Sequence, residues 1–242
     1  SATFPQAVQA LAGQLLHEPV RIEITAPDQP VTAIVQRAIQ VDTARRTELL
    51  KHLVKQGAEA GGWAQVLVFV ATRYAAEHVA WKLHQSGLYA TPLHGDMSQG
   101  KRTEVLETFR DGGWDIVVTT DLAARGLDIP GLPVVVNYDL PRSATDYTHR
   151  IGRTGRAGAS GLAISFVSAE TEAHFRLIEK RQGLLLPREQ VPGFEPLESA
   201  SADPAPVETA APGKLAPGTG GIKGKRPSKK DKLRAAAAAK GG

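Results

Sequence analysis

The sequence contains no cysteine, and this absence removes several kinds of chemistry. Without cysteine there is no disulfide framework, no thiolate ligand for zinc and no thiol nucleophile. The sequence also has no run of about 18 or more apolar residues, so we expect no membrane-spanning helix and no membrane partner. The first residues, Ser1 to Phe4, lack the basic-then-apolar layout of a signal peptide. We therefore expect a soluble, cytoplasmic protein.

Aromatic residues are scarce, with only three Trp, four Tyr and six Phe in 242 residues, and none of them lies beyond residue 200. Stacking of nucleic-acid bases on proteins needs aromatic side chains or arginine. We therefore expect base stacking to contribute little to any nucleic-acid binding by this chain.

Net charge is small overall but unevenly distributed. The formal charge is +4, yet residues 201–242 carry seven Lys and two Arg against two Asp and one Glu. The same segment holds five Pro, seven Gly and ten Ala and only four larger aliphatic residues. Such a composition buries too little apolar surface to offset chain entropy, so the segment is predicted to be disordered. Its basic run at residues 223–234 suits nonspecific contact with nucleic-acid phosphates, and a purely solubilising tail is an equal alternative.

Between residues 31 and 182, apolar runs of strand length alternate with stretches of helical period. Two of these runs, residues 66–70 and 116–118, are continuously apolar, which is typical of strands in a parallel sheet that is covered by helices on both faces. The sequence therefore predicts a three-layer α/β domain with right-handed crossovers. The predicted strands are residues 32–41, 65–70, 89–93, 115–119, 133–138 and 161–167, and the predicted helices are residues 44–57, 73–86, 98–111, 143–150 and 171–182.

In a parallel sheet of this kind, functional residues gather in the loops at the carboxyl ends of the strands. One such loop holds four basic residues within eight positions, interleaved with glycines: His149, Arg150, Arg153 and Arg156. Guanidinium groups match phosphate oxygens, and the three-residue spacing of Arg153 and Arg156 puts them on one face of a helical turn. We predict a clamp that stabilises charge on a transferring phosphoryl group. The regular glycines disfavour a merely solvated charge run.

Two further loops carry polar residues suited to phosphate or ribose. Thr120 follows a buried strand, where its hydroxyl and the backbone N–H groups suit a phosphate oxygen. Asp128, close to Gly126, suits a ribose hydroxyl, although Thr120 and Asp128 could be simple helix-capping and turn residues. In the other loop, Ser98 is a predicted helix N-cap and Arg102 on the first turn suits a backbone phosphate.

Taken in order, these segments resemble the C-terminal RecA-like domain of a DEAD-box RNA helicase, with bacterial RhlE-type members the most similar. The matching segments are residues 66–72 (motif IV), 94–102 (motif IVa), 119–129 (motif V), 136–141 (motif Va) and 149–156 (motif VI). Five motifs in order at suitable spacing make this a specific signal. The resemblance implies a second RecA-like domain over residues 28–185, followed by the tail over residues 186–242.

The resemblance also covers the start of the chain. Residues 1–3 are similar to motif III, so residues 1–27 are expected to be the end of a first RecA-like domain, with a helix over 4–16 and a strand over 19–25. No G-x-x-x-x-G-K-[ST] phosphate loop and no Asp-Glu-Ala-Asp motif occur in the chain. The chain is therefore expected to be a fragment that lacks its N-terminal RecA-like partner domain. That partner would bind most of the ATP and Mg, and this chain alone would not hydrolyse ATP.

The resemblance implies a role for individual residues. Arg153 and Arg156 would be arginine fingers toward the γ-phosphate, with His149 linking them to the other domain. Asp128 and Gly126 would contact the nucleotide, and Phe69 would pack behind the arginines. The expected RNA contacts are Arg102, Thr120, Gly95 and Thr72. The implied activity is ATP-driven local unwinding of RNA duplexes. A DNA helicase or translocase of the same superfamily and a non-catalytic RNA-binding module remain alternatives, whereas the glycine spacing disfavours a dinucleotide-binding domain.

Overall fold

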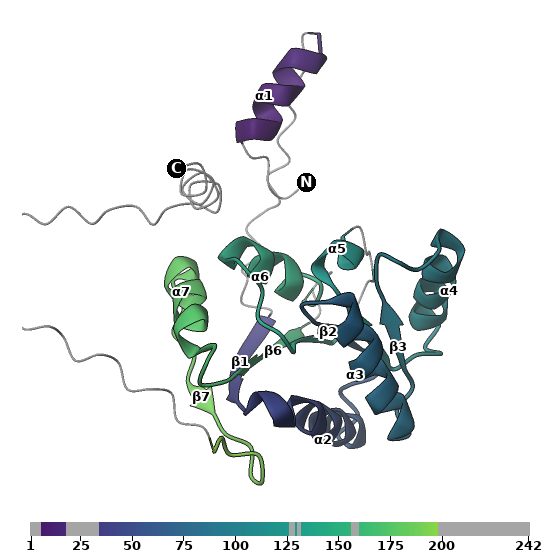
Figure 1. Ribbon diagram of the computed structural model, residues 1–242, viewed down its shortest axis with the longest axis vertical. Helices are drawn as coiled ribbons and strands as arrows, with labels where there is room; N and C mark the ends of the chain where they lie inside the picture. The colour runs from purple at the N-terminus through teal and green to yellow at the C-terminus, as the bar shows by residue number, and fades with distance from the viewer. Residues whose placement is uncertain (1–5, 18–33, 126–128, 130–131, 156–159, 198–242) are drawn as a thin grey trace, which may run out of the picture. The chain divides into compact units, whose positions relative to one another are not determined.

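The computed structural model describes residues 6–17, 34–125, 129, 132–155 and 160–197. Within these residues, seven parallel strands form one sheet in the order β3-β4-β2-β5-β6-β1-β7 (Figure 1). The strands are β1 (Ile34–Gln40), β2 (Val66–Phe69), β3 (Ala90–Leu93), β4 (Ile116–Thr119), β5 (Val134–Asn137), β6 (Gly161–Val167) and β7 (Arg188–Glu189). The predicted parallel α/β architecture is confirmed. Residues 198–242 of the predicted tail, the expected motif III at residues 1–3 and the expected strand at residues 19–25 lie outside the described residues.

Helices cover both faces of this sheet, with α2 and α3 on one side and α6 and α7 on the other (Figure 1). The helical elements are α1 (Gln6–Leu15), the 3-10 turn η2 (Thr43–Arg45), α2 (Arg46–Glu59), α3 (Arg73–Gln85), α4 (Gln99–Arg110), α5 (Asp121–Ala124), α6 (Ala144–Ile151) and α7 (Glu172–Gln182). Every predicted helix is present. The helix predicted at residues 44–57 begins as the 3-10 turn η2, and the carboxylate of Asp42, which precedes it, accepts a hydrogen bond from the Leu197 N–H (2.9 Å).

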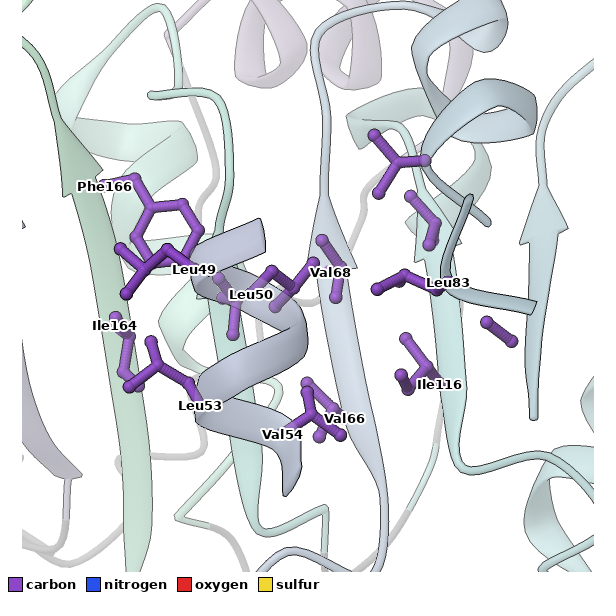
Figure 2. Packing of buried hydrophobic residues seen from close by; sticks show 14 of the residues in the cluster. Leu49, Leu50, Leu53, Val54, Val66, Val68, Leu83, Ile116, Ile164 and Phe166 are labelled. Carbon is purple, nitrogen blue, oxygen red and sulfur yellow. The ribbon is translucent and has the colours of Figure 1, made fainter. Parts of the chain in front are cut away.

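The core on the first face follows from the helical period of α2. Leu49, Leu50 and Leu53 recur on one side of this helix and are buried against the sheet. Figure 2 shows them beside Ile164 and Phe166 of β6. The central strands are buried on both faces, which is why their sequences are continuously apolar.

The second face has its own core beneath α4 to α7. Val105 and Phe109 of α4 pack on the β2, β3 and β4 side. Tyr147 of α6 and Phe175 of α7 meet edge to face, with ring centroids 6.1 Å apart. A helix–helix contact of this kind fixes α6, and therefore the residues that follow it, relative to the sheet.

The described structure continues beyond residue 185, where the sequence placed the start of the tail. Strand β7 pairs with β1 through Ala38 and Ile39. Its Arg188 reaches back to α7, donating hydrogen bonds to Glu172 (3.0 Å) and Glu179 (2.7 Å). No helix among the described residues is long and apolar enough to cross a membrane.

Candidate functional site

Three adjacent strands end together at one edge of the sheet and position the candidate site. In register, Phe69 of β2 lies between Thr119 of β4 and Asn137 of β5. The loops that follow them line two cavities, of about 40 Å³ and 420 Å³, which share Asp121, Arg125 and Asp146 in their walls. The site therefore lies at the carboxyl edge, where the topology of a parallel sheet predicts it.

Arg153 and His149 line the smaller cavity. Arg153 is half-buried, and its Nε donates a hydrogen bond to the backbone carbonyl of His149 (3.3 Å). This residue lies in the turn after α6, not on a continuing helix as the spacing with Arg156 suggested, because α6 ends at Ile151. The structure thus brings His149 and Arg153 together in one wall. Arg156 lies outside the described residues, as do Gly126 and Asp128.

Arg150 corrects the prediction of a clamp made from the whole basic cluster. Its side chain is only 2% exposed. The guanidinium donates to both carboxylate oxygens of Asp121 (2.6 and 2.8 Å), to the Asn137 side chain (3.2 Å) and to the Asp139 carbonyl (2.6 Å). It also stacks on the Phe69 ring, 5.0 Å from the ring centroid. Arg150 therefore holds α5 and α6 together through internal hydrogen bonds and is not a phosphate ligand.

A second pairing that the sequence did not reveal centres on Asp139. One of its carboxylate oxygens accepts from the Ala71 N–H (2.8 Å) and the other pairs with Arg46 (2.9 Å). Asp139 thus fixes the β2–α3 loop, which contains Thr72, to α2. Sequence spacing gives no signal for these pairs, because their members are 68 and 93 residues apart.

The larger cavity contains two of the predicted RNA-contact residues, Gly95 and Thr120. Gly95 is exposed, and Thr120 is half-buried with a side chain that does not cap α5. The other two predicted contacts lie beside the cavity. Thr72 caps α3 by accepting a hydrogen bond from the Ala75 N–H (3.1 Å), and half-buried Arg102 donates to the Ala123 carbonyl (3.4 Å).

The charges around the larger cavity favour an anionic ligand. Its lining includes three arginines and three aspartates, which are Arg73, Arg125, Arg142, Asp96, Asp121 and Asp146. Each aspartate is engaged by a neighbour: Asp96 pairs with Arg73, Asp121 pairs with Arg150, and Asp146 accepts from the Ser143 hydroxyl (2.7 Å). Arg125 and Arg142 line the same wall, and guanidinium groups of this kind suit phosphate.

The size and ligand set of the smaller cavity suit only part of a cofactor. At about 40 Å³ it is far smaller than the roughly 300–1,000 Å³ of a pocket that encloses a whole small-molecule ligand. No group of three His, Asp or Glu side chains suited to a metal ion occurs within the described ranges. The arrangement can present Arg153 to a phosphate group but cannot enclose a nucleotide.

Comparison with known proteins agrees with this geometry. A family model, the helicase conserved C-terminal domain, matches residues 45–158. A solved structure is similar as well: the crystal structure of the Escherichia coli DEAD-box protein SrmB bound to the regulator of ribonuclease activity A. It is 35% identical to this chain in the matched region, with a TM-score of 0.62. The match covers 69% of this chain and 96% of that chain. The chain belongs to the DEAD-box family. Its described domain is the C-terminal RecA-like domain, as the sequence predicted.

Other DEAD-box relatives are similar over the same region. The ATP-dependent RNA helicase DBP2 of Eremothecium gossypii is 41% identical over 168 residues, which are 69% of this chain and 30% of DBP2. The ATP-dependent RNA helicase CshA of Listeria monocytogenes is 37% identical over 180 residues, or 74% of this chain and 34% of CshA. The chain thus spans about a third of the length of these curated relatives. The RhlE-type refinement stays a prediction.

A further relative was solved with RNA and a nucleotide complex bound. The Saccharomyces cerevisiae protein Dbp5, in a structure bound to RNA and ADP BeF3, is 32% identical to this DEAD-box chain with a TM-score of 0.66. The match covers 78% of this chain and 50% of Dbp5.

Proposed function

We propose that this domain is the second half of an ATP-dependent RNA helicase. Together with a first RecA-like domain, it would couple ATP binding and hydrolysis to local unwinding of RNA duplexes. The observation that carries this proposal is the pair of adjoining cavities at one sheet edge, one walled by Arg153 and His149 and the other by Gly95 and Thr120. The DEAD-box relative bound to RNA and ADP BeF3 supports the same pair of ligands.

The smaller cavity is the proposed nucleotide half-site. Arg153, together with Arg156, would donate hydrogen bonds to the γ-phosphate and so stabilise the charge that develops during phosphoryl transfer. The Nε bond to the His149 carbonyl orients the Arg153 guanidinium for this task. Asp128 and Gly126 would contact the ribose side of the nucleotide. ATP supplies the phosphoryl group, and the first domain would hold most of the nucleotide and its Mg.

The larger cavity is the proposed RNA site. The Gly95 backbone and the Thr120 hydroxyl would contact backbone phosphates, with Arg102 and Thr72 at the margins. Such contacts position a strand and carry little information about base sequence. The guanidinium groups of Arg125 and Arg142 in the cavity wall support a polyanionic ligand.

The ion pair between Asp121 of α5 and Arg150 of α6 supports coupling of the two half-sites. Thr120 is followed directly by Asp121, which is clamped by Arg150, three residues before Arg153. A movement of the RNA contact at Thr120 would therefore be transmitted to the turn that carries Arg153 through one partly buried ion pair. This rigid connection suits a domain that must respond to both ligands at once.

The decisive experiment compares ATP hydrolysis by this chain with hydrolysis by a protein that also contains the first RecA-like domain. We expect background turnover from the chain alone and RNA-stimulated turnover from the longer protein. Stimulation by single-stranded DNA equal to that by RNA would favour a DNA translocase. Robust turnover by the 242-residue chain alone would contradict the half-site proposal.

A further inference from the structure

Three aromatic side chains lie along the exposed face of α3, and we call them the aromatic stripe: Tyr74, His78 and Trp81. The Tyr74 and His78 rings are stacked, with centroids 5.8 Å apart and planes 9° apart. His78 and Trp81 continue the stack at 6.4 Å and 24°. The spacing i, i+4, i+7 places all three on one side of the helix, over a length of about 10 Å.

The aromatic stripe does not stabilise the described domain by burial. Tyr74 is 72% exposed and Trp81 is 59% exposed, while the opposite side of α3, formed by Ala76, Val79 and Leu83, is buried in the core. The helix therefore packs on the sheet without these rings. Large exposed aromatic surfaces that are not used in packing are typical of interaction sites.

The position of the aromatic stripe relates it to the larger cavity. Arg73, the first residue of α3, lines that cavity and pairs with Asp96 on its far side. Tyr74 comes directly after it, so the stripe starts at the rim of the cavity. Because α3 follows the carboxyl end of β2, the helix then runs from this rim back along the sheet toward Trp81 (Figure 1).

The charges that flank the aromatic stripe suit a polyanion. Arg73, which pairs with Asp96, lies at its start, and exposed Lys82 lies beside Trp81. The acidic residue on this part of the helix, Glu77, is paired with the His94 imidazole (3.1 Å). Cationic groups beside exposed aromatic rings form the pattern by which proteins hold single strands, because the phosphates meet the cations while the bases stack on the rings.

We propose that the aromatic stripe is a stacking platform for the bases of single-stranded RNA that extends beyond the larger cavity. The inference rests on the RNA-binding role proposed above and adds a second type of contact to it. The cavity holds phosphates of the central nucleotides, and the stripe holds the bases of flanking nucleotides. Because stacking accepts any base, the platform lengthens the binding site without adding sequence preference. On this proposal, stacking contributes more to RNA binding than the small number of aromatic residues predicts.

The test uses the full 242-residue chain and measures RNA affinity as a function of oligonucleotide length. The probes are labelled oligouridylates of about 4 and about 12 nucleotides, and an abasic strand of the longer length. In the double variant Tyr74→Ala/Trp81→Ala we expect the longer RNA to bind at least about fivefold more weakly, the lower limit for loss of a stacked base. Binding of the short RNA and of the abasic strand should not change.

Two matched variants control for folding and for surface loss. Leu177→Ala removes an exposed apolar side chain of similar exposure (60%) from α7 and should leave RNA binding unchanged. Trp81→Phe keeps an aromatic ring and should retain most of the affinity for the longer RNA. Circular dichroism should be the same for all variants, because the altered side chains are exposed.

The outcomes separate this inference from the proposed function. If Thr120→Val weakens binding of RNA of both lengths but the double variant binds like the wild type, the stacking platform is wrong and the phosphate site stands. If the wild-type chain binds neither RNA, both proposals fail for this chain. If the wild-type chain forms a dimer that the double variant does not form, a second copy covers the aromatic stripe and the inference is overturned.

Discussion

The guanidinium of Arg150 and the carboxylate of Asp121 form a two-point ion pair across 29 residues of sequence, with Nε–Oδ1 and Nη2–Oδ2 distances of 2.6 and 2.8 Å. Arg150 is almost fully buried, whereas Asp121 is 39% exposed at the wall of both cavities. Two parallel N–H···O bonds fix the orientation of both planar groups. This pair therefore determines how the helix after β4 lies relative to the turn that carries Arg153.

Replacement of Arg150 should therefore destabilise the domain. Arg150→Ala removes four hydrogen-bonded contacts and leaves the Asn137 side chain and the Asp139 carbonyl without a buried donor. Asp121 is 39% exposed and can be hydrated, but each of the two acceptors left buried without a donor costs about 1–3 kcal/mol, so about 2–6 kcal/mol together. We expect the free energy of unfolding, measured by urea titration of the 242-residue chain, to fall by about that amount.

Arg142 provides the matched control for Arg150. It lines the larger cavity but is exposed, so Arg142→Ala should change the unfolding free energy by no more than about 0.5 kcal/mol. Arg150→Lys keeps the charge but loses the fork of donors, and should give an intermediate loss. Equal stability of Arg150→Ala and the wild type would contradict the role of Arg150 in holding α5 and α6 together.

The sequence predicted the sheet and its helices because period and apolar runs are local signals. The strands and helices that it missed are the shortest ones: α5 has four residues and β7 has two, too few to express a period. The site was predicted as a set of loops, and the structure brings Gly95, Thr120, His149 and Arg153 to one edge. The role of Arg150 was missed because the sequence alone does not show whether the partner of a basic residue is a ligand or a distant aspartate.

Gly161 at the start of β6 supports the Arg153 turn by its lack of a side chain. A Cβ atom built there would lie 2.5 Å from the Gly155 backbone nitrogen and would also clash with the Thr154 side chain. Thr154 is itself held through its hydroxyl, which donates to the Leu132 carbonyl (2.5 Å). We expect Gly161→Ala to displace residues 153–155 and to destabilise the chain by about 1–3 kcal/mol, as overpacking does. Urea titration measures this loss.

A matched glycine distinguishes the clash from the general effect of adding a methyl group. Gly100 lies on α4 with open space around a built Cβ, so Gly100→Ala should be neutral or stabilising by up to about 1 kcal/mol. If Gly161→Ala behaved in the same way, close packing of β6 against the Arg153 turn would be wrong.

The ion-pair network of Arg188 should make stability depend on acid pH. Burial alone would raise the pKa values of Glu172 and Glu179, but hydrogen bonds from Arg188 outweigh it and hold both pKa values below the ordinary range. The folded state therefore binds fewer protons than the unfolded state near pH 4. Their stabilising contribution is present above the unfolded pKa and is lost as pH falls through the folded values. Urea midpoints should fall between about pH 5 and pH 3.

Arg188→Met tests whether this network causes the acid sensitivity. Without the guanidinium, both glutamates lose the hydrogen bonds that lower their pKa values most, and both pKa values should rise. Stability near pH 7 should therefore fall, and its loss between pH 5 and 3 should become smaller. Arg37→Met is the control, because its pair with Glu189 is one-third exposed on both sides and contributes little. An unchanged pH profile in Arg188→Met would assign the acid sensitivity to other carboxylates.

The proposed arginine finger gives the largest expected effect on activity. In a protein that contains both RecA-like domains, Arg153→Ala should reduce ATP turnover by at least about 10³-fold, the scale for loss of an arginine that stabilises phosphoryl transfer. Stability should change little, because Arg153 lies half-buried in a turn and not in the core. Arg150→Ala should lose activity together with stability, so only Arg153→Ala separates the two. Arg142→Ala, on the RNA side of the same edge, should keep most of the turnover at saturating RNA. Turnover by Arg153→Ala equal to that of the wild type would mean that the small cavity holds no reacting phosphate.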